Sequence, residues 1–307
     1  MEFRKVLAEE IISLMEEDEK VILLDADLAS PNGTSPVYKA FPNRCFDVGI
    51  QEANMASVAA GLSAYGYKPI IVSFAPFVTR RIYDQIAVSI SYAKQNVKII
   101  GTDPGLSAEL NGGTHMTFAD MALIRCLPDF VIYDAVDDIQ YRSALKTLLR
   151  HNGNVYIRAP RKSRPTVFKE DYEFHLGKID VVSEGKDISI IASGTMVYEA
   201  LAAKEILKNK NIDVEIISIN TLNPLDKEGL LNSIKKTNKV LTVENHNMHG
   251  GVYSNICELT AEYYPIKVNG IGITDKFGQV GKYDELLKEY HLTANDIVIK
   301  VEEILQK

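Results

Sequence analysis

Residues 129–159 read DFVIYDAVDDIQYRSALKTLLRHNGNVYIRA and contain a strand, a helix and a second strand. The first run, 129–135, is short, apolar and rich in β-branched side chains, which is typical of a buried strand. Residues 136–150 are amphipathic at helical spacing, and 155–159 form another buried run. Two parallel strands need a helical crossover between them. This stretch therefore predicts a parallel sheet with helices packed on it.

The same alternation extends toward both ends of the chain. Further strands are expected at VILLDAD (21–27), PIIVSF (69–74), VKIIGT (97–102), DISIIASG (187–194), VEIISI (214–219), KVLTVEN (239–245) and IKVNGIG (266–272). A helical segment is expected at 51–66, whereas the proline-containing, basic stretch at 160–174 breaks the pattern and indicates a linker. We predict an α/β fold of two doubly wound, mostly parallel-sheet domains. The expected boundaries are 1–165, a linker at 166–178, and 179–307.

Composition argues against several classes of function. The 307 residues are 46% hydrophobic, enough to fill the cores of two domains. A net charge of -7 offers no basic surface for nucleic acid. No signal peptide or membrane-spanning apolar run is apparent, so no membrane partner is expected. The three cysteines, Cys45, Cys126 and Cys257, lack metal-like spacing, so we expect a cytoplasmic protein with no metal ligands of its own.

Candidate site residues follow the predicted strands, at the edge where doubly wound sheets bind ligands. Asp25 and Asp27 lie where a strand runs into a turn, and taken alone they are more typical of an Asx turn or a helix cap. Glu52 opens a helix that is apolar on nearly every face, which favours burial, although a glutamate in a first helical turn is more often solvated. A buried carboxyl must be paired or protonated.

Two further segments carry ring side chains. Phe74 and Phe77 bracket Pro76 after a predicted strand, and core packing explains such a pair more often than a ring-binding slot does. In GGTH (112–115), two glycines permit close approach of the main chain to a ligand, and His115 follows them. A single loop histidine is more often structural. Each of these signals is weak alone, so their joint order carries the information.

Together, and in this order, the segments resemble one family. Four motifs are similar to the pyrimidine-binding domain of transketolases: DADLAS (25–30), DVGIQEANMASVAAGL (47–62), SFAPF (73–77), and GGTH followed by LIRCLPD (123–129). Two motifs resemble the transketolase C-terminal domain: VLTVENHNMHGG (240–251) and DKFGQVGKYDELLKEYHL (275–292). The resemblance covers essentially the whole chain and implies a thiamine-diphosphate enzyme built from these two domains.

The resemblance implies a cofactor held between two chains. Transketolases bind the diphosphate through a Gly-Asp-Gly motif, and this sequence contains none. We therefore expect a separate diphosphate-binding subunit, equivalent to the N-terminal section of a transketolase, to hold the diphosphate and a divalent cation, Mg or Ca. A two-fold symmetric hetero-oligomer is expected. The implied reaction transfers a two-carbon ketol unit between a ketose phosphate and an aldose phosphate.

The resemblance also implies roles for residues around the cofactor. Glu52 matches the glutamate that shares a proton with N1′ of the aminopyrimidine, and burial suits that task. Phe74 and Phe77 match the aromatic residues that flank the ring. Asp27 and Leu28 match a pair that lies beside the cofactor. In this interpretation Glu52 is catalytic and all five residues bind the cofactor.

Other residues are implied in substrate binding. His115 matches a catalytic histidine that hydrogen-bonds the donor ketose. Arg4 and Arg158 match arginines that bind the sugar phosphate, and Arg161 is a further candidate for the same contact.

Three positions depart from the family pattern at the substrate end. Asp103 stands where transketolases have a phosphate-binding histidine, Asn111 replaces an aspartate, and Pro31 displaces a serine. These departures leave three options open. The sugar phosphate differs, or Arg4 and Arg158 hold the phosphate alone, or one substrate is not phosphorylated.

Three alternative functions also remain open. The β subunit of a 2-oxo-acid dehydrogenase decarboxylating component has the same two domains, but GGTH and the Arg4–Lys5 pair look like transketolase. Deoxyxylulose-phosphate synthase is suggested by DVGIQE, GYKPI and IRAPR, although that family carries its diphosphate domain in the same chain. The third alternative is a non-catalytic α/β module, which the combination of Glu52, His115 and two aromatic residues disfavours.

Overall fold

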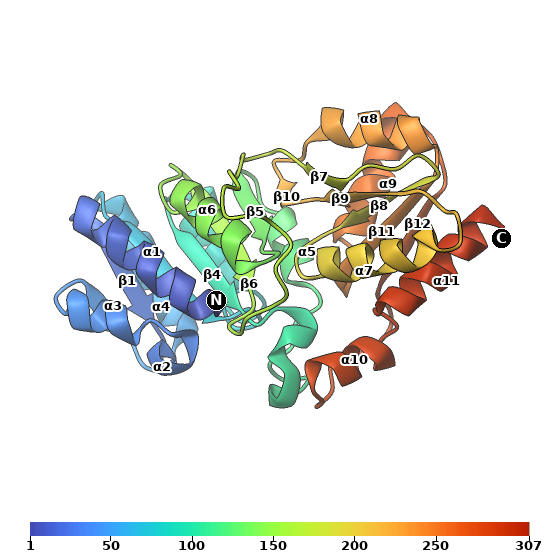
Figure 1. Ribbon diagram of the computed structural model, residues 1–307. Helices are drawn as coiled ribbons and strands as arrows, with labels where there is room; N and C mark the ends of the chain where they lie inside the picture. The colour runs from blue at the N-terminus through green and yellow to red at the C-terminus, as the bar shows by residue number, and fades with distance from the viewer. Residues whose placement is uncertain (307) are drawn as a thin grey trace.

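The computed structural model describes residues 1–306, which form two sheets with helices packed on both faces of each (Figure 1). In this part of the chain one sheet has seven strands and the other has five. The blue-to-green elements of Figure 1 build the first sheet, and the yellow-to-red elements build most of the second. This architecture confirms the predicted α/β class with two mostly parallel sheets.

The first sheet is parallel except at one edge. Its strands are β1 (Val21–Asp25), β2 (Cys45–Asp47), β3 (Lys68–Phe74), β4 (Lys98–Thr102), β5 (Phe130–Asp134), β6 (Asn154–Ala159) and β10 (Thr221–Asn223). They run in the order β10-β5-β6-β4-β3-β1-β2, and only the β10–β5 pair is antiparallel. The carboxyl ends of β1, β3, β4 and β6 therefore meet at one edge of the sheet.

Helices cover both faces of this sheet because each presents an apolar stripe to it. The elements are α1 (Phe3–Glu17), α2 (Ala29–Asn32), α3 (Ser35–Ala40), α4 (Glu52–Ala64), the π-helical η1 (Gln85–Tyr92), the 3-10 helix η2 (Gly105–Asn111), α5 (Asp120–Arg125) and α6 (Asp138–Leu148). Helices α1 and α6 share one core with the sheet, and the Phe3 and Tyr141 rings lie 5.4 Å apart between them. Helices α4 and α5 and the π-helix η1 pack on the opposite face.

The second sheet follows the same plan. Its strands are β7 (Asp180–Ser183), β8 (Ile188–Ala192), β9 (Val214–Ser218), β11 (Val240–Asn247) and β12 (Val268–Ile273), in the order β12-β11-β8-β9-β7. Its helices are α7 (Met196–Lys208), α8 (Lys227–Thr237), α9 (Val252–Tyr263), α10 (Tyr283–Glu289) and α11 (Ala294–Leu305). One core holds α7, α10 and α11, whereas the core under α8 and α9 is continuous with the core under α4 and α5.

All nine runs that the sequence analysis reads as strands are strands in the structure. The analysis misses β2, β7 and β10, which are short, and two of which, β2 and β7, are only partly buried. Strand β10 comes from the second half of the chain but pairs with β5 of the first sheet. The division into residues 1–165, a linker at 166–178 and residues 179–307 stays a prediction.

Two properties of the chain bear on its surroundings. Among residues 1–306, no helix combines the length and the apolar character that a bilayer crossing requires. Cys45 is buried, Cys126 is exposed and Cys257 is intermediate, and all three are free thiols. The cytoplasmic location stays a prediction.

A buried arginine links the two sheets. Arg158, near the end of β6, is 1% exposed, and its Nε and Nη1 donate to Asp120 and Asp134, each at 2.8 Å. Its Nη2 donates to the main-chain oxygen of Asn245 on β11 at 3.1 Å. The Tyr156 hydroxyl also donates to Asp120, at 2.7 Å. Because β11 belongs to the second sheet, one guanidinium fixes the carboxyl ends of β5 and β6 against it.

Replacing Arg158 by Met should lower the free energy of unfolding by about 3 to 5 kcal/mol, because buried Asp120 and Asp134 would lose their counter-charge. Arg150→Met is a matched control, since Arg150 pairs with Glu17 at the surface and its loss should cost below about 1 kcal/mol. Urea unfolding followed by circular dichroism compares the two variants. Equal losses would contradict a special role for Arg158.

Candidate active site

Most of the sequence-predicted residues come together beyond the carboxyl ends of β1, β3 and β4. A chain of contacts joins Glu52, Phe77, Phe74, His115, Arg161, Asp103 and Arg4. Asp27 and Leu28 lie in the turn after β1, and Asn111 is exposed at the end of η2. Arg158 lies apart from this group, in the interior contact between the sheets.

Glu52 is the first residue of α4 and is 3% exposed. The helix buries Met55, Ala56 and Ala59, whose small or flexible side chains let its first turn approach the sheet closely. The Oε1 atom of Glu52 accepts a hydrogen bond of 2.7 Å from Nη1 of Arg81. The Arg81 side chain is 44% exposed. The buried carboxylate is therefore ion-paired with a guanidinium that reaches it from the solvent side.

Three rings lie next to this ion pair. Phe74 ends β3 and Phe77 follows it, with ring centres 5.9 Å apart. The His115 ring meets Phe77 at 5.1 Å and Phe74 at 5.7 Å, edge to face in both cases. The Arg81 guanidinium lies 3.8 Å from the centre of the Phe77 ring. The sequence-predicted aromatic pair and histidine thus form one cluster with the predicted carboxylate.

The second half of the chain supports the His115 loop. A Cβ atom on Gly113 would lie 2.2 Å from the main-chain oxygen of Gly278, and one on Gly112 would lie 2.8 Å from Val280. Only glycine allows contacts this close. Thr114 Oγ1 and His115 Nδ1 are 2.9 Å apart. The position of His115 therefore depends on the segment between β12 and α10.

Arginines form the neighbouring edge of the cluster. Arg161 Nε donates to Asp103 at 2.6 Å, and its guanidinium lies 4.7 Å from the centre of the Phe74 ring. Burial raises the pKa of Asp103, and the charge of Arg161 opposes that rise. Arg4 donates to Glu2 at 3.1 Å, and its main-chain N–H donates to the oxygen of Arg161. Asp103 is therefore neutralised by Arg161 rather than free to repel an anion.

The turn after β1 is fixed by a buried carboxyl. Asp25 is fully buried, and its Oδ1 accepts from the main-chain N–H of Leu28 at 2.5 Å. Burial raises the pKa of Asp25 to about 6, and the nearby charge of Asp47 adds to the rise. Asp27 is exposed with a φ of 59°, and its N–H donates to Asp47 at 2.9 Å. This left-handed turn presents Asp27 and Leu28 at the edge of the sheet.

Comparison with known proteins identifies the family of the chain. Residues 1–166 match the transketolase pyrimidine binding domain, and residues 177–297 match the transketolase C-terminal domain. The chain belongs to the transketolase family. The two matched domains follow in the order that the sequence analysis expects.

Relatives of similar length are subunits of divided transketolases. The 6-deoxy-6-sulfo-D-fructose transketolase subunit SqwH of Clostridium sp. (strain MSTE9) is 40% identical over 97% of this chain and 92% of its own. An apulose-4-phosphate transketolase subunit of Actinobacillus succinogenes is 32% identical over 95% of both chains. A solved split-gene transketolase, described as an inactive β4 tetramer, is 38% identical with a TM-score of 0.90 over 100% of this chain and 98% of its own.

Membership of the transketolase family implies dependence on thiamine diphosphate, and the cluster fits one half of that cofactor. A buried carboxylate beside two phenyl rings suits an aminopyrimidine, which offers both a hydrogen-bonding edge and a ring face. Within residues 1–306, no group of three His, Cys, Asp or Glu side chains is placed to hold a metal ion.

Two residues lie differently from what the sequence suggests. Arg81 is absent from the sequence-predicted set although it contacts both Glu52 and Phe77. The paired arginines at 80 and 81 give no signal for this contact, because Glu52 is distant in sequence. The sequence analysis expects Arg158 to bind a sugar phosphate. That role is untested, and the guanidinium's buried contacts with two carboxylates favour a structural one.

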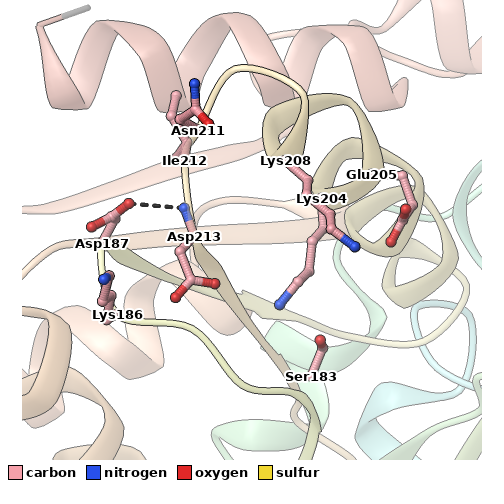
Figure 2. Close-up of a pocket in the computed structure, with 9 residues that line it drawn as sticks. All are labelled: Ser183, Lys186, Asp187, Lys204, Glu205, Lys208, Asn211, Ile212 and Asp213. Carbon is pink, nitrogen blue, oxygen red and sulfur yellow. Dashed lines mark hydrogen bonds between the residues drawn. The ribbon is translucent and has the colours of Figure 1, made fainter.

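A separate surface cavity lies far from these residues in the fold. It has a volume of about 580 Å³ and is lined by Ser183, Lys186, Asp187, Lys204, Glu205, Lys208, Asn211, Ile212 and Asp213 (Figure 2). The cavity lies at the amino ends of β8 and β9. Its lining includes both acidic and basic side chains. It contains none of the predicted site residues.

Replacing Gly113 by Ala should displace the His115 loop, because the added Cβ would collide with the Gly278 oxygen. We expect a stability loss of about 1 to 3 kcal/mol and a shifted NMR signal of the His115 ring. The control Gly61→Ala places its Cβ in open space and should leave that signal unchanged. An unshifted His115 signal in Gly113→Ala would show that the 278 segment does not position the histidine.

Proposed function

We propose that this chain is the pyrimidine-binding subunit of a split transketolase, which transfers a two-carbon ketol unit from a ketose to an aldose. The observation that best supports this proposal is the buried Glu52 carboxylate beside the ring cluster of Phe74, Phe77 and His115. The names of the two relatives, both transketolase subunits, support the same reaction class. These contacts suit the pyrimidine ring of any thiamine-diphosphate enzyme, so the names of the relatives, rather than the contacts, favour ketol transfer over decarboxylation.

Each residue of the cluster has a distinct task in this proposal. Thiamine diphosphate, when bound, supplies the carbon nucleophile that takes up the ketol unit. Glu52 holds a proton at the ring nitrogen N1′, a task that its exclusion from water favours. Phe74 and Phe77 present ring faces and edges that orient the pyrimidine and exclude water. His115 donates a hydrogen bond to an oxygen of the donor sugar.

The arginine edge suits a sugar with an anionic end group. The two relatives are named for a sulfonated and a phosphorylated sugar, which share such a group. Arg161 and Arg4 each pair with one carboxylate, yet a guanidinium has five N–H donors and keeps some free. In this proposal Asp103 is neutralised by Arg161 and Asn111 is exposed. Both side chains then shape the part of the site that receives the anionic end of the sugar. We propose Arg4 and Arg161 as the contacts for the anionic group.

A separate diphosphate-binding subunit completes the site in this proposal. That subunit would hold the diphosphate and its divalent cation, since this sequence lacks the Gly-Asp-Gly motif. The related solved chain is described as an inactive β4 tetramer. Three large apolar side chains near the His115 loop are also highly exposed: Leu110 at 64%, Val280 at 69% and Phe277 at 94%. An association in two-fold symmetric form would cover them.

In the assembled enzyme, Glu52→Gln should slow hydrogen-deuterium exchange at C2 of the cofactor by about 100-fold or more, because Gln cannot hold the shared proton. Cofactor binding should persist, since Gln keeps the shape of the side chain. NMR after acid quench measures the exchange independently of any sugar. Exchange within about threefold of the unaltered enzyme would remove the chemical basis of the proposal.

His115→Ala is the matched comparison for the Glu52 test. Its predicted contacts are to sugar oxygens, so C2 exchange should stay within about threefold of the unaltered enzyme while turnover of the donor ketose falls. A parallel loss of exchange would place His115 at the cofactor instead.

The chain alone should bind thiamine diphosphate at least about tenfold more weakly than the two-subunit enzyme, the equivalent of one lost charge-assisted hydrogen bond. Calorimetry with and without Mg²⁺ measures both affinities. Tight, Mg²⁺-dependent binding by the chain alone would mean that the diphosphate is held within these 307 residues.

A further inference from the structure

Arg81 makes two contacts that coincide with those expected of the pyrimidine ring. Its Nη1 donates to the Glu52 carboxylate at 2.7 Å, and its planar guanidinium lies 3.8 Å from the centre of the Phe77 ring. An aminopyrimidine bound here would need the same carboxylate as its acceptor and an aromatic face of this cluster for stacking. The Arg81 guanidinium therefore occupies the place that the aminopyrimidine ring is proposed to take.

We propose that Arg81 acts as a stand-in for the aminopyrimidine, closing the ring site of the unloaded chain and leaving it when the cofactor binds. This inference rests on the proposed function, because it takes Glu52 and Phe77 as ring contacts. The inference adds that Arg81, a residue of the same chain, competes with the pyrimidine ring for Glu52 and Phe77.

The ion pair has a physical reason in the unloaded chain. Glu52 is only 3% exposed, and an ionised carboxylate that deeply buried requires a partner. Arg81 supplies the partner while its own side chain stays 44% exposed. Arg81 can therefore leave toward water at little penalty, whereas Glu52 cannot. The asymmetry makes the arginine the mobile member of the pair.

Departure of Arg81 also changes the state in which Glu52 is most stable. While the guanidinium is present, a full negative charge on Glu52 is compensated. Once a neutral ring replaces it, the buried carboxyl is best satisfied by sharing a proton with a ring nitrogen. Displacement of Arg81 thus couples the arrival of the ring to the proton that catalysis requires at Glu52.

The adjacent arginine offers a matched control. Arg80 carries the same charge at the next position, is exposed, and has no hydrogen bond or ion pair to Glu52. Replacing either arginine by Met removes one positive charge from the same segment and keeps a flexible apolar stem. Any difference between the two variants therefore reports the Glu52 and Phe77 contacts rather than net charge.

The test is a titration of the full chain with 4-amino-5-hydroxymethyl-2-methylpyrimidine, a neutral ring that needs no diphosphate site. If Arg81 closes the site in most molecules, Arg81→Met should bind the ring about five- to tenfold more tightly than the unaltered chain. Arg80→Met should bind within about twofold of it. NMR chemical-shift changes measure the affinities. Equal, weaker or undetectable binding by Arg81→Met overturns the proposal.

A second measurement uses the unaltered chain, in case Arg81→Met does not fold. The Nε–H signal of Arg81 should exchange with water at least about threefold faster, and change shift, once the ring saturates the site. An unchanged Arg81 signal in the ring-saturated chain overturns the proposal. If these tests fail while Glu52→Gln still slows C2 exchange in the assembled enzyme, only the stand-in role of Arg81 falls. If C2 exchange is also unaffected, the proposed function falls with it.

Discussion

Arg158 places one positive charge between Asp120 and Asp134 in the interior, with the main chain of β11 as its third partner. A desolvated charge persists only when each of its donors is satisfied, so β5, β6 and β11 must be in place together. This arrangement seats the second sheet against the first. Gly278 also lies against Gly113, so the C-terminal half of the molecule shapes the loop that carries His115.

Charge compensation within the site follows a common plan. Two buried carboxylates near the ring cluster have an arginine partner that is more exposed than the carboxylate: Arg81 for Glu52 and Arg161 for Asp103. Both arginines also lie over a phenyl ring, Phe77 and Phe74 respectively. In these two pairs the guanidinium group therefore lies closer to the solvent than the carboxylate does. Under the proposed function, an anionic sugar would meet guanidinium groups first.

The sequence predicts most of the long strands because they appear as short apolar runs rich in β-branched side chains, and these strands are buried on both faces. It does not predict β2 or β10, each of which is only three residues long. Family order brings Glu52, Phe74 and His115 to one place, but no spacing rule connects Glu52 with Arg81. For Arg158, the sequence shows only an arginine late in a strand. Whether it faces substrate or the interior depends on Asp120 and Asp134, which the fold supplies.

Strand β10 pairs antiparallel with β5 and so finishes the first sheet with residues from the second half of the chain. A fragment that stops at residue 166 would contain every residue proposed to contact the ring, yet it would leave β5 as a bare outer strand. Unpaired strand edges recruit other chains and promote aggregation. The pyrimidine-binding half therefore depends on β10 of the second half to cover this edge. A chimera that takes the pyrimidine-binding half from a relative should accordingly take β10 from the same relative.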